Sequence, residues 1–386
     1  MSTVISRAVQ TPRIPWRILA VAAIVAILAI AAVLVAGSRR HVPAPFGPAS
    51  NGLVAYAKNG VIYTADPVTG KATALMTGTA HDSDPVWSRD GTMLGFVHQT
   101  DAGQGQLMVA AADGSGLRPI TQALPGIGVH DFLDPGHVNL AFSPDGQEVA
   151  FTSGDRGPTK ALWVADVRQG VARQLNLGTN LHPDGEPSWM PPAGDEILFN
   201  GLFGSQSGLY AVDVHSGKVR PIVEPSARFG AGVSTVSPDG SRIAYTQIDN
   251  QVTDRNPYQV HIVNSDGSGD VALPMPASAV FQDLPVWSND GTRLVIVRGY
   301  AAHAEDVRLA IVPADGANTG VETKPSITGC CDYAVDWSPD DSRILFLPED
   351  WNGAMTSQRL IDPSTGALTN ASWDGISVPA WQRLAP

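Results

Sequence analysis

The sequence predicts an all-β fold: a single seven-bladed β-propeller of four-stranded blades, preceded by one transmembrane helix. Three observations carry this prediction. Two different sequence landmarks each recur seven times, at spacings of about 45 to 55 residues. A run of 19 consecutive apolar residues lies near the N-terminus. The first and last parts of the repeat region are complementary fragments of one unit, so that a ring of units can close.

The first landmark is a tight turn that follows a short strand. It reads as an aromatic or apolar residue, then Ser, then Asp-Gly two positions later. In its Ser-Pro-Asp-Gly form, Pro fixes φ, the Asp side chain caps the turn and Gly accepts a positive φ. Apolar and β-branched runs follow it, such as residues 148–151 and 293–297, as strands require. The copies, of which the last two are degenerate or truncated, begin at Trp87, Phe142, Val236, Trp287, Trp337, Trp189 and Trp381.

The second landmark lies between copies of the first. It is an apolar strand that ends in Asp or a turn, followed by Gly and another short strand, so each unit holds four short antiparallel strands. Calcium loops are an alternative reading of the Asp-Gly turns. The turns lack the several spaced acidic ligands that calcium needs, so plain turns are favoured. The copies start at Asp66, Asp113, Asp166, Asp213, Asp266, Asp315 and Asp362.

The repeat region begins and ends within one unit. Residues 53–57, 61–65 and 72–76 form three predicted strands that no Trp strand precedes. Residues 378–384 form a predicted innermost strand with nothing after it. Pairing the last strand with the first three completes one blade and leaves no open ring edge.

The first landmark, with a Pro two residues before the Trp, resembles the repeat of TolB-like bacterial propellers, which are also WD-repeat-like. The resemblance covers residues 50–386 and implies the propeller fold more than any activity. TolB itself has an extra N-terminal domain and six blades, so its role in the Tol–Pal system is not carried over. The matching copies are Pro85-Val86-Trp87, Pro187-Ser188-Trp189 and Pro285-Val286-Trp287.

The apolar run, residues 18–36, is long enough to cross a membrane. As a helix of about 1.5 Å per residue it would span roughly 28 Å, close to the thickness of a bilayer's hydrocarbon core. A cleaved signal peptide is the alternative, but its apolar region is usually shorter, and Leu34 is too large for position −3 of a cleavage site after Ala36. An uncleaved anchor is therefore favoured. Arginines flank the run on both sides, at Arg7, Arg13, Arg17, Arg39 and Arg40.

These features give a predicted domain order and location. The protein is expected to be a single-pass protein of the cell membrane with its propeller outside the cytoplasm. The orientation signal is weak, because three Arg precede the span and two follow it. The expected parts are a cytoplasmic segment (1–17), a transmembrane helix (18–36), a Pro-rich stalk (37–51) and the propeller (52–386).

Charge excludes one class of partner. The 346 residues after position 40 carry 20 basic and 37 acidic side chains, a net charge of −17. Such a surface repels phosphate backbones, so nucleic acid is not an expected partner. The propeller is expected to be monomeric and to bind an envelope protein, peptide or glycan, with the membrane contacted through the N-terminal helix.

Candidate site residues cluster just before the Trp strands, at the rim of the central channel. The long connections 122–138, 248–258, 299–307 and 348–357 lie on the same face, and long loops on a rigid scaffold often carry function. Asn139 and His130 lie nearby. The expected ligand- or partner-binding residues are Asp84, His137, Glu186, Asp283 and Asp336.

A metal site is the sharper interpretation of this rim. No regular His spacing supports it, and the same residues could simply cap strand ends and solvate the rim, so no cofactor is predicted. A divalent metal in the central channel stays open as the alternative. Its candidate ligands are His81, His137, His182, Asp84 and Glu186.

Cys330 and Cys331 are the two cysteines of the chain and are adjacent. In an exported domain they could form a vicinal disulfide, which is strained because neighbouring Cα atoms lie only about 3.8 Å apart. Two free thiols, or a bond that only stiffens the loop, are the favoured alternatives.

The sequence favours binding over catalysis. Prolyl-oligopeptidase-type enzymes carry similar propellers beside a separate catalytic domain, for which no residues remain here. Residues 204–208 only resemble a G-x-S-x-G elbow, because Gln206 replaces the Ser. The expected function is a membrane-tethered scaffold outside the cytoplasm. The alternative is a metal-dependent propeller enzyme, a lyase or hydrolase, with its site at the channel mouth.

Overall fold

The computed structural model divides the chain into two compact units, Met1–Val42 and Pro43–Pro386. Within the second unit it describes residues 47–75, 82–127, 140–154, 159–252, 258–300, 307–323, 329–350, 357–375 and 377–384. The predicted membrane helix, residues 18–36, lies outside these residues. No helix that is long and apolar enough to span a membrane occurs among the described residues.

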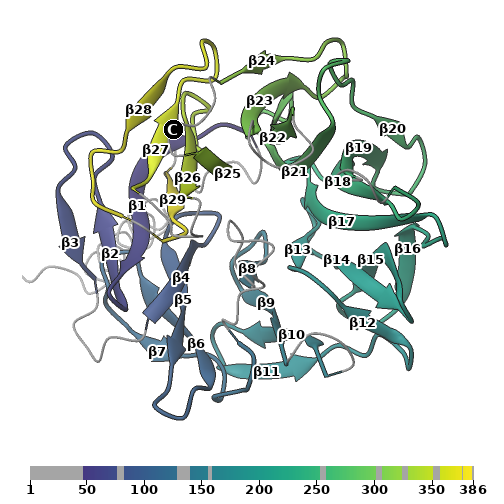
Figure 1. Cartoon of the computed structure of the whole chain (residues 1–386). Coiled ribbons are helices and arrows are strands. Elements are labelled where there is room, and N and C mark those ends of the chain that lie inside the picture. Colours follow the sequence, from purple (N-terminus) through teal and green to yellow (C-terminus); the bar gives the residue numbers. More distant parts are fainter. Residues whose placement is uncertain are drawn as a thin grey trace, which may run out of the picture. The chain divides into compact units, whose positions relative to one another are not determined.

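The second unit is a ring of seven antiparallel sheets in its described part (Figure 1). Each sheet is one blade. The blades are numbered 1 to 7 around the ring, starting with the blade that contains β1. This confirms the predicted all-β, seven-bladed propeller. Blades 1 to 3 comprise β29 (Ala380–Leu384), β1 (Ser50–Lys58), β2 (Val61–Ala65) and β3 (Ala72–Ala74); β4 (Asp82–Trp87), β5 (Met93–Gln99), β6 (Gly105–Ala111) and β7 (Arg118–Pro119); β8 (Leu140–Phe142), β9 (Glu148–Ser153), β10 (Ala161–Asp166) and β11 (Val171–Gln174).

The remaining blades follow the same order, except that blade 4 has its innermost strand in two pieces, β12 and β13, which both pair with β14. Blades 4 to 7 comprise β12 (Leu181–Pro183), β13 (Ser188–Trp189), β14 (Glu196–Phe203), β15 (Gln206–Asp213) and β16 (Val219–Val223); β17 (Phe229–Val236), β18 (Arg242–Asp249), β19 (Tyr258–Asn264) and β20 (Val271–Ala272); β21 (Phe281–Trp287), β22 (Arg293–Gly299), β23 (Val307–Pro313) and β24 (Val321–Glu322); β25 (Gly329–Trp337), β26 (Ile344–Asp350), β27 (Arg359–Ile361) and β28 (Leu368–Asn370).

The last strand closes the ring as predicted. β29 pairs antiparallel with β1, with Val54 opposite Trp381 and Ala55 opposite Ala380. Blade 1 therefore takes its innermost strand from the C-terminal end of the chain and its other three from the start of the repeat region. The two most distant parts of the repeat are thus hydrogen-bonded neighbours, which removes the free edge of an open sheet.

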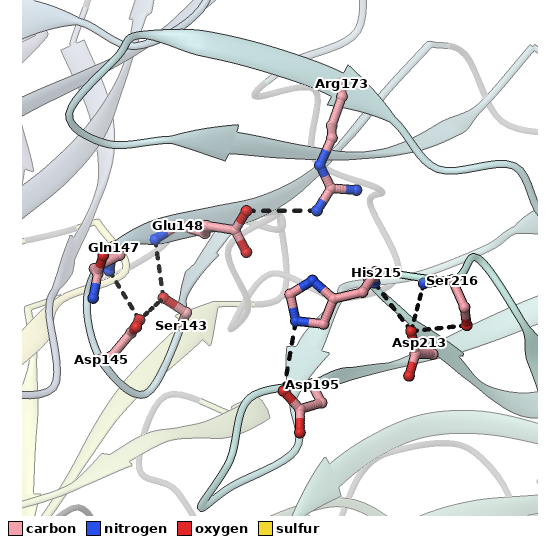
Figure 2. A network of polar contacts seen from close by, with 9 residues as sticks. All are labelled: Ser143, Asp145, Gln147, Glu148, Arg173, Asp195, Asp213, His215 and Ser216. Carbon is pink, nitrogen blue, oxygen red and sulfur yellow. Dashed lines mark hydrogen bonds and ion pairs between the residues drawn. The ribbon is translucent and has the colours of Figure 1, made fainter.

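The Ser-x-Asp-Gly landmark forms the turn that the sequence predicts. In blade 3 the Ser143 hydroxyl donates to Asp145 at 2.6 Å and accepts from the Glu148 amide at 3.0 Å, and Asp145 also accepts from the Gln147 amide at 3.0 Å (Figure 2). Gly146 takes a φ of 71°, which a side chain would disfavour. The same Ser–Asp bond joins Ser88 to Asp90, Ser237 to Asp239, Ser288 to Asp290 and Ser338 to Asp340.

The second landmark also forms tight turns. Asp213 accepts from the backbone amides of His215 at 3.0 Å and Ser216 at 2.7 Å, as Figure 2 shows. The hydrogen bonds from Ser216 lower the pKa of Asp213, which keeps this turn acceptor ionised. These carboxylates are occupied by their own turns, in agreement with the plain-turn interpretation.

The apolar core lies between neighbouring blades. One cluster joins Ala55 and Ile62 of blade 1 to Trp87, Leu94 and Phe96 of blade 2, and similar clusters follow around the ring. Each Trp at the end of an innermost strand points toward the preceding blade. The Trp189 indole N–H donates to the Ala141 carbonyl at 2.9 Å, which ties blade 4 to blade 3.

Strand direction sorts the connections onto two faces. The short-turn face carries the turns between first and second strands, such as residues 88–92, and between third and fourth strands, such as residues 112–117. The long-loop face carries the connections between second and third strands and between blades, the longest of which is residues 120–139. The chain enters the propeller at the short-turn face, where the Ala49 amide donates to the Pro339 carbonyl at 2.7 Å.

Candidate functional site

The innermost strands are irregular at the positions where the sequence places its rim residues. Register shifts occur between Ser83 and Val86 and between Asp283 and Val286, with related shifts in blades 5 and 7. Such β-bulges re-aim side chains and are common beside functional sites. Asp84 takes a φ of 56° at its bulge, in the left-handed region that Asp tolerates better than most residues.

Asp84 is buried, with 6% of its surface exposed, and accepts a hydrogen bond from the Ser83 hydroxyl at 2.9 Å. Its strand neighbour Asp82 is also buried and bonds His98 Nδ1 at 2.7 Å. The sequence analysis did not single out this Asp–His pair, because the two residues lie on different strands. The pair lies at the long-loop end of blade 2, beside the predicted rim residue Asp84.

Glu186 lies in the break that splits the innermost strand of blade 4, between β12 and β13. Asp184 and Gly185 form the rest of this break, and Gly185 has a φ of 144°. Asn200 fixes the break from β14: its carbonyl oxygen accepts from the Asp184 amide at 2.8 Å, and its side chain bonds Gly232 of blade 5. Asp84 and Glu186 both stand three residues before a Trp, so they occupy the same repeat position in blades 2 and 4.

Asp283 and Asp336 differ from the first two acids in their surroundings. Asp283 accepts from the Thr246 hydroxyl at 2.6 Å and from the Leu284 amide at 2.8 Å, so it joins blade 6 to blade 5. Asp336 stands one residue before Trp337 and faces β29 of blade 1. Burial raises the pKa of Asp336 to about 7, against the lowering effects of the Trp381 amide and Arg383.

His182 is on β12 and lines a small cleft between blades 3 and 4. The cleft has a volume of about 190 Å³, and Lys160, Asn176 and Gly178 also line it. His182 thus lies on β12, whereas Glu186 lies in the break that follows this strand. No other candidate metal ligand named from the sequence lines this cleft.

The predicted metal set cannot be assembled from the described residues alone. His81 and His137 lie outside them, as do His130 and Asn139. Among the residues that the structure does describe, no group of three or more His, Cys, Asp or Glu could hold a metal ion. The backbone of Cys330 and Cys331 belongs to β25, with Cys331 opposite Glu349, and their side chains lie outside the described part.

The sequence analysis missed a buried cation beneath the long-loop face. Arg298, at the end of β22, is fully buried and forms an ion pair with Glu322 at 2.6 Å. Tyr300 donates to the same carboxylate, and Arg308 stacks over the Tyr300 ring at 4.5 Å. This cluster fixes both ends of the connection between β22 and β23.

Two exposed aromatic side chains also lie on the long-loop face. Phe203 ends β14 with 53% of its surface exposed, and Phe229 begins β17 with 37% exposed. β17 also lies close to the start of β15, the strand that follows Phe203: a Cβ atom on Gly230 would lie 2.3 Å from the Ser207 hydroxyl. Arg228 lies over the Phe229 ring at 4.7 Å and forms an ion pair with Asp249 at 2.9 Å.

Residues 135–319 match a family model described as PD40, a TolB β-propeller domain. No curated protein matches the sequence.

Solved structures with the same fold come from several kinds of protein. TolB from Acinetobacter baumannii is 15% identical, with a TM-score of 0.50 over 88% of this chain and 68% of TolB. An oligogalacturonate lyase in complex with manganese is 13% identical, with a TM-score of 0.58 over 84% of each chain.

The β-propeller domain of the Trilobed protease from Pyrococcus furiosus is 14% identical, with a TM-score of 0.55 over 84% of this chain and 97% of that domain. That domain is described as having an open velcro topology, whereas this chain closes blade 1 with β29. At these identities the similar structures establish the fold alone. Together with the family model over residues 135–319, they support a TolB-like β-propeller fold for this chain.

Proposed function

We propose that this protein is a binding scaffold that presents the long-loop face of its propeller to an envelope protein, peptide or glycan. In this proposal residues 18–36 tether it to the cell membrane, with the propeller outside the cytoplasm. The fold itself serves many functions, so the binding surface is inferred from how the two faces of the propeller differ.

The exposed aromatic pair carries the proposal. Aromatic residues are enriched at protein interfaces, where they bury a large area with little loss of conformational entropy. Phe203 and Phe229 lie on strands of adjacent blades, and Arg228 covers one edge of the pair. The exposed apolar residues on the short-turn face are smaller. They include Val171 and Val271, at the starts of the outermost strands of their blades.

Buried side-chain contacts also fix the backbone beneath the long-loop face. Buried Arg298 anchors the connection beside blade 6, and Asn200 anchors the broken strand of blade 4. The chain enters at the short-turn face, so the long-loop face is on the side away from residue 47. Rigid elements that support long loops keep the entropic cost of binding low.

Site-specific cross-linking tests the proposal. A photoreactive amino acid is placed at Phe203 in one full-length variant and at Val171 in another, in cells that normally make the protein. We expect discrete adducts from position 203 that are absent from position 171. Replacing Phe203 and Phe229 by Ser should weaken capture of the same partner at least about tenfold, as loss of an interface hot spot does.

Replacing Val171 and Val271 by Ser is the matched control, since it removes exposed apolar surface from the other face. It should leave capture unchanged. Adducts of equal yield from both positions, or from position 171 alone, would contradict a scaffold that binds through its long-loop face.

A metal-dependent enzyme is the second candidate. Asp84, Asn139 and Glu186 stand at the same repeat position in three consecutive blades, which favours a shared ligand at one part of the channel rim. Metal analysis of the purified protein separates the two candidates. The enzyme requires one equivalent of divalent metal that Asp84→Asn and Glu186→Gln both lose, while the exposed Asp195→Asn control retains it. A metal-free protein that chelator does not destabilise supports the scaffold.

A further inference from the structure

The short-turn face has its own ring of equivalent residues. In each blade one residue follows the Ser of the tight turn, or the residue that replaces this Ser, directly after the innermost strand. These seven positions surround the short-turn mouth of the channel. Four of them are prolines, and three carry polar side chains. In blade order the seven are Arg383, Arg89, Pro144, Pro191, Pro238, Asn289 and Pro339.

Arg89 has no partner among the residues that the structure describes. Its Nε–H group is fully buried and donates to no described residue, and no described ion pair joins its guanidinium to a carboxylate. Burial, together with the positive charge of Arg383, lowers the pKa of Arg89 to about 10. The residue is mostly buried but keeps some exposed surface, so a small ligand can reach it from solvent.

Arg383 lies beside Arg89 and reaches across the mouth. The Gln382 side chain donates to the Gly91 carbonyl at 2.6 Å, which holds the end of β29 against the Arg89 turn. The Arg383 guanidinium donates to Asn289 of blade 6 and to the Gly47 carbonyl, at 2.5 Å for the latter. Its Nε atom, like that of Arg89, is buried without a partner in the described residues.

Two carboxylates, Asp336 and Asp341, act on Arg383, but neither acts on Arg89. Asp341 already accepts from the Asn289 amide at 2.7 Å and from the Asp290 amide at 2.9 Å. Burial raises the pKa of Asp336 to about 7, so this carboxyl is only partly ionised near neutral pH. Two adjacent guanidinium groups therefore carry excess positive charge, in a domain whose overall charge is strongly negative.

An uncompensated buried charge is costly, and like charges side by side add to that cost. We infer that Arg89 and Arg383 form a binding site for one oxyanion, a carboxylate or phosphate group, at the short-turn mouth of the channel. The planar guanidinium fork matches the two oxygens of such a group, and its unused N–H donors can form bidentate, charge-assisted hydrogen bonds. The four prolines around the mouth make its wall rigid, because each has a fixed φ.

The test measures oxyanion binding to the purified full-length protein, with sodium phosphate and sodium succinate as probes. Sodium chloride at equal ionic strength is the reference, because screening alone changes surface charges. We expect either oxyanion to raise the unfolding temperature and to bind with one equivalent by calorimetry. Arg89→Gln should weaken this binding at least about tenfold, the loss expected for a charge-assisted bond.

Arg89→Gln has a second expected effect that distinguishes a ligand site from a structural role. Without an oxyanion, the variant should be as stable as the natural protein or more stable, because it removes an unpaired charge. Arg173→Gln is the control, since Arg173 is exposed and pairs only with Glu148 at 3.5 Å (Figure 2); it should leave binding unchanged.

Two results would overturn the inference. One is equal stabilisation of the natural protein and Arg89→Gln by both oxyanions, or stabilisation of neither. The other is a clear loss of stability in Arg89→Gln without any oxyanion, which would show that Arg89 has a structural partner.

Discussion

The junctions between blades fall into two kinds. At the regular junctions a Trp indole crosses to the preceding blade: Trp189, Trp287 and Trp337 donate to backbone carbonyls at 2.9, 3.2 and 3.2 Å. At the closing junctions, on either side of β29, the equivalent indole N–H groups of Trp87 and Trp381 are buried without a partner in the described residues. Among the described residues, these indole donors are thus satisfied at three junctions away from β29 and unsatisfied at the two junctions that involve β29.

Polar side chains replace the missing indole bonds around β29. Gln382 takes the place of the turn Ser and bonds both the Leu53 amide at 3.0 Å and the Gly91 carbonyl. Arg383 and Asp336 lie beside it, at the meeting of blades 7 and 1. This difference shows that a local polar latch closes the ring: Gln382 and Arg383, from the C-terminal end of the repeat region, bond Leu53 and Gly47 at its start.

The largest expected effect comes from breaking this latch. Gln382 is buried, with 6% exposed, so Gln382→Ala leaves a half-buried amide at Leu53 and a buried carbonyl at Gly91 unsatisfied. We expect the free energy of unfolding to fall by about 3 kcal/mol, measured by urea denaturation. The exposed Gln174→Ala control should change it by less than about 0.5 kcal/mol. A loss no greater than that of the control would show that the latch contributes nothing.

A smaller effect is expected from Asp336, and it depends on pH. The folded-state pKa of Asp336, about 7, lies above the ordinary value of 3.8. The folded state therefore binds the proton more tightly, and this group's contribution to stability is complete below about pH 4 and is lost as pH rises through 7. Asp336→Asn should raise the free energy of unfolding by about 2 kcal/mol at pH 8 and by little at pH 5.

The control for the pH series is Asp101→Asn, at an exposed turn position. It should leave the pH profile unchanged. If Asp336→Asn gives the same change at both pH values, the carboxyl does not titrate in this range, and the closing junction is less buried than described.

The sequence predicted the propeller well because its signals are local. Each turn is specified by four or five adjacent residues, as at Ser143 and Asp145, and the count of such turns fixes the number of blades. The closure by β29 was predictable because only the first and last fragments lacked partners. The same logic misses the break in blade 4, where Glu186 falls between two short strands held by Asn200.

The candidate site was less predictable because its contacts join distant blades. Asp283 is bound by Thr246 of blade 5, and Arg383 by Asn289, which is 94 positions earlier. No spacing rule along the chain reveals such pairs. The connection 122–138 also differs from a simple surface loop: Ile127 is buried with 2% exposed, so the first part of this connection belongs to the core.

The comparison of junctions is tested most directly by Trp→Phe substitution at four positions matched in burial. Trp189 and Trp287 donate indole bonds and are 6% and 7% exposed, while Trp381 and Trp87 lack them and are also 6% and 7% exposed. Phe142 occupies the same position in blade 3, so the ring tolerates Phe there. We predict that Trp189→Phe and Trp287→Phe reduce the free energy of unfolding by about 1 kcal/mol more than Trp381→Phe and Trp87→Phe do. Equal losses in the two pairs, or larger losses at Trp381 and Trp87, would contradict the distinction between regular and closing junctions.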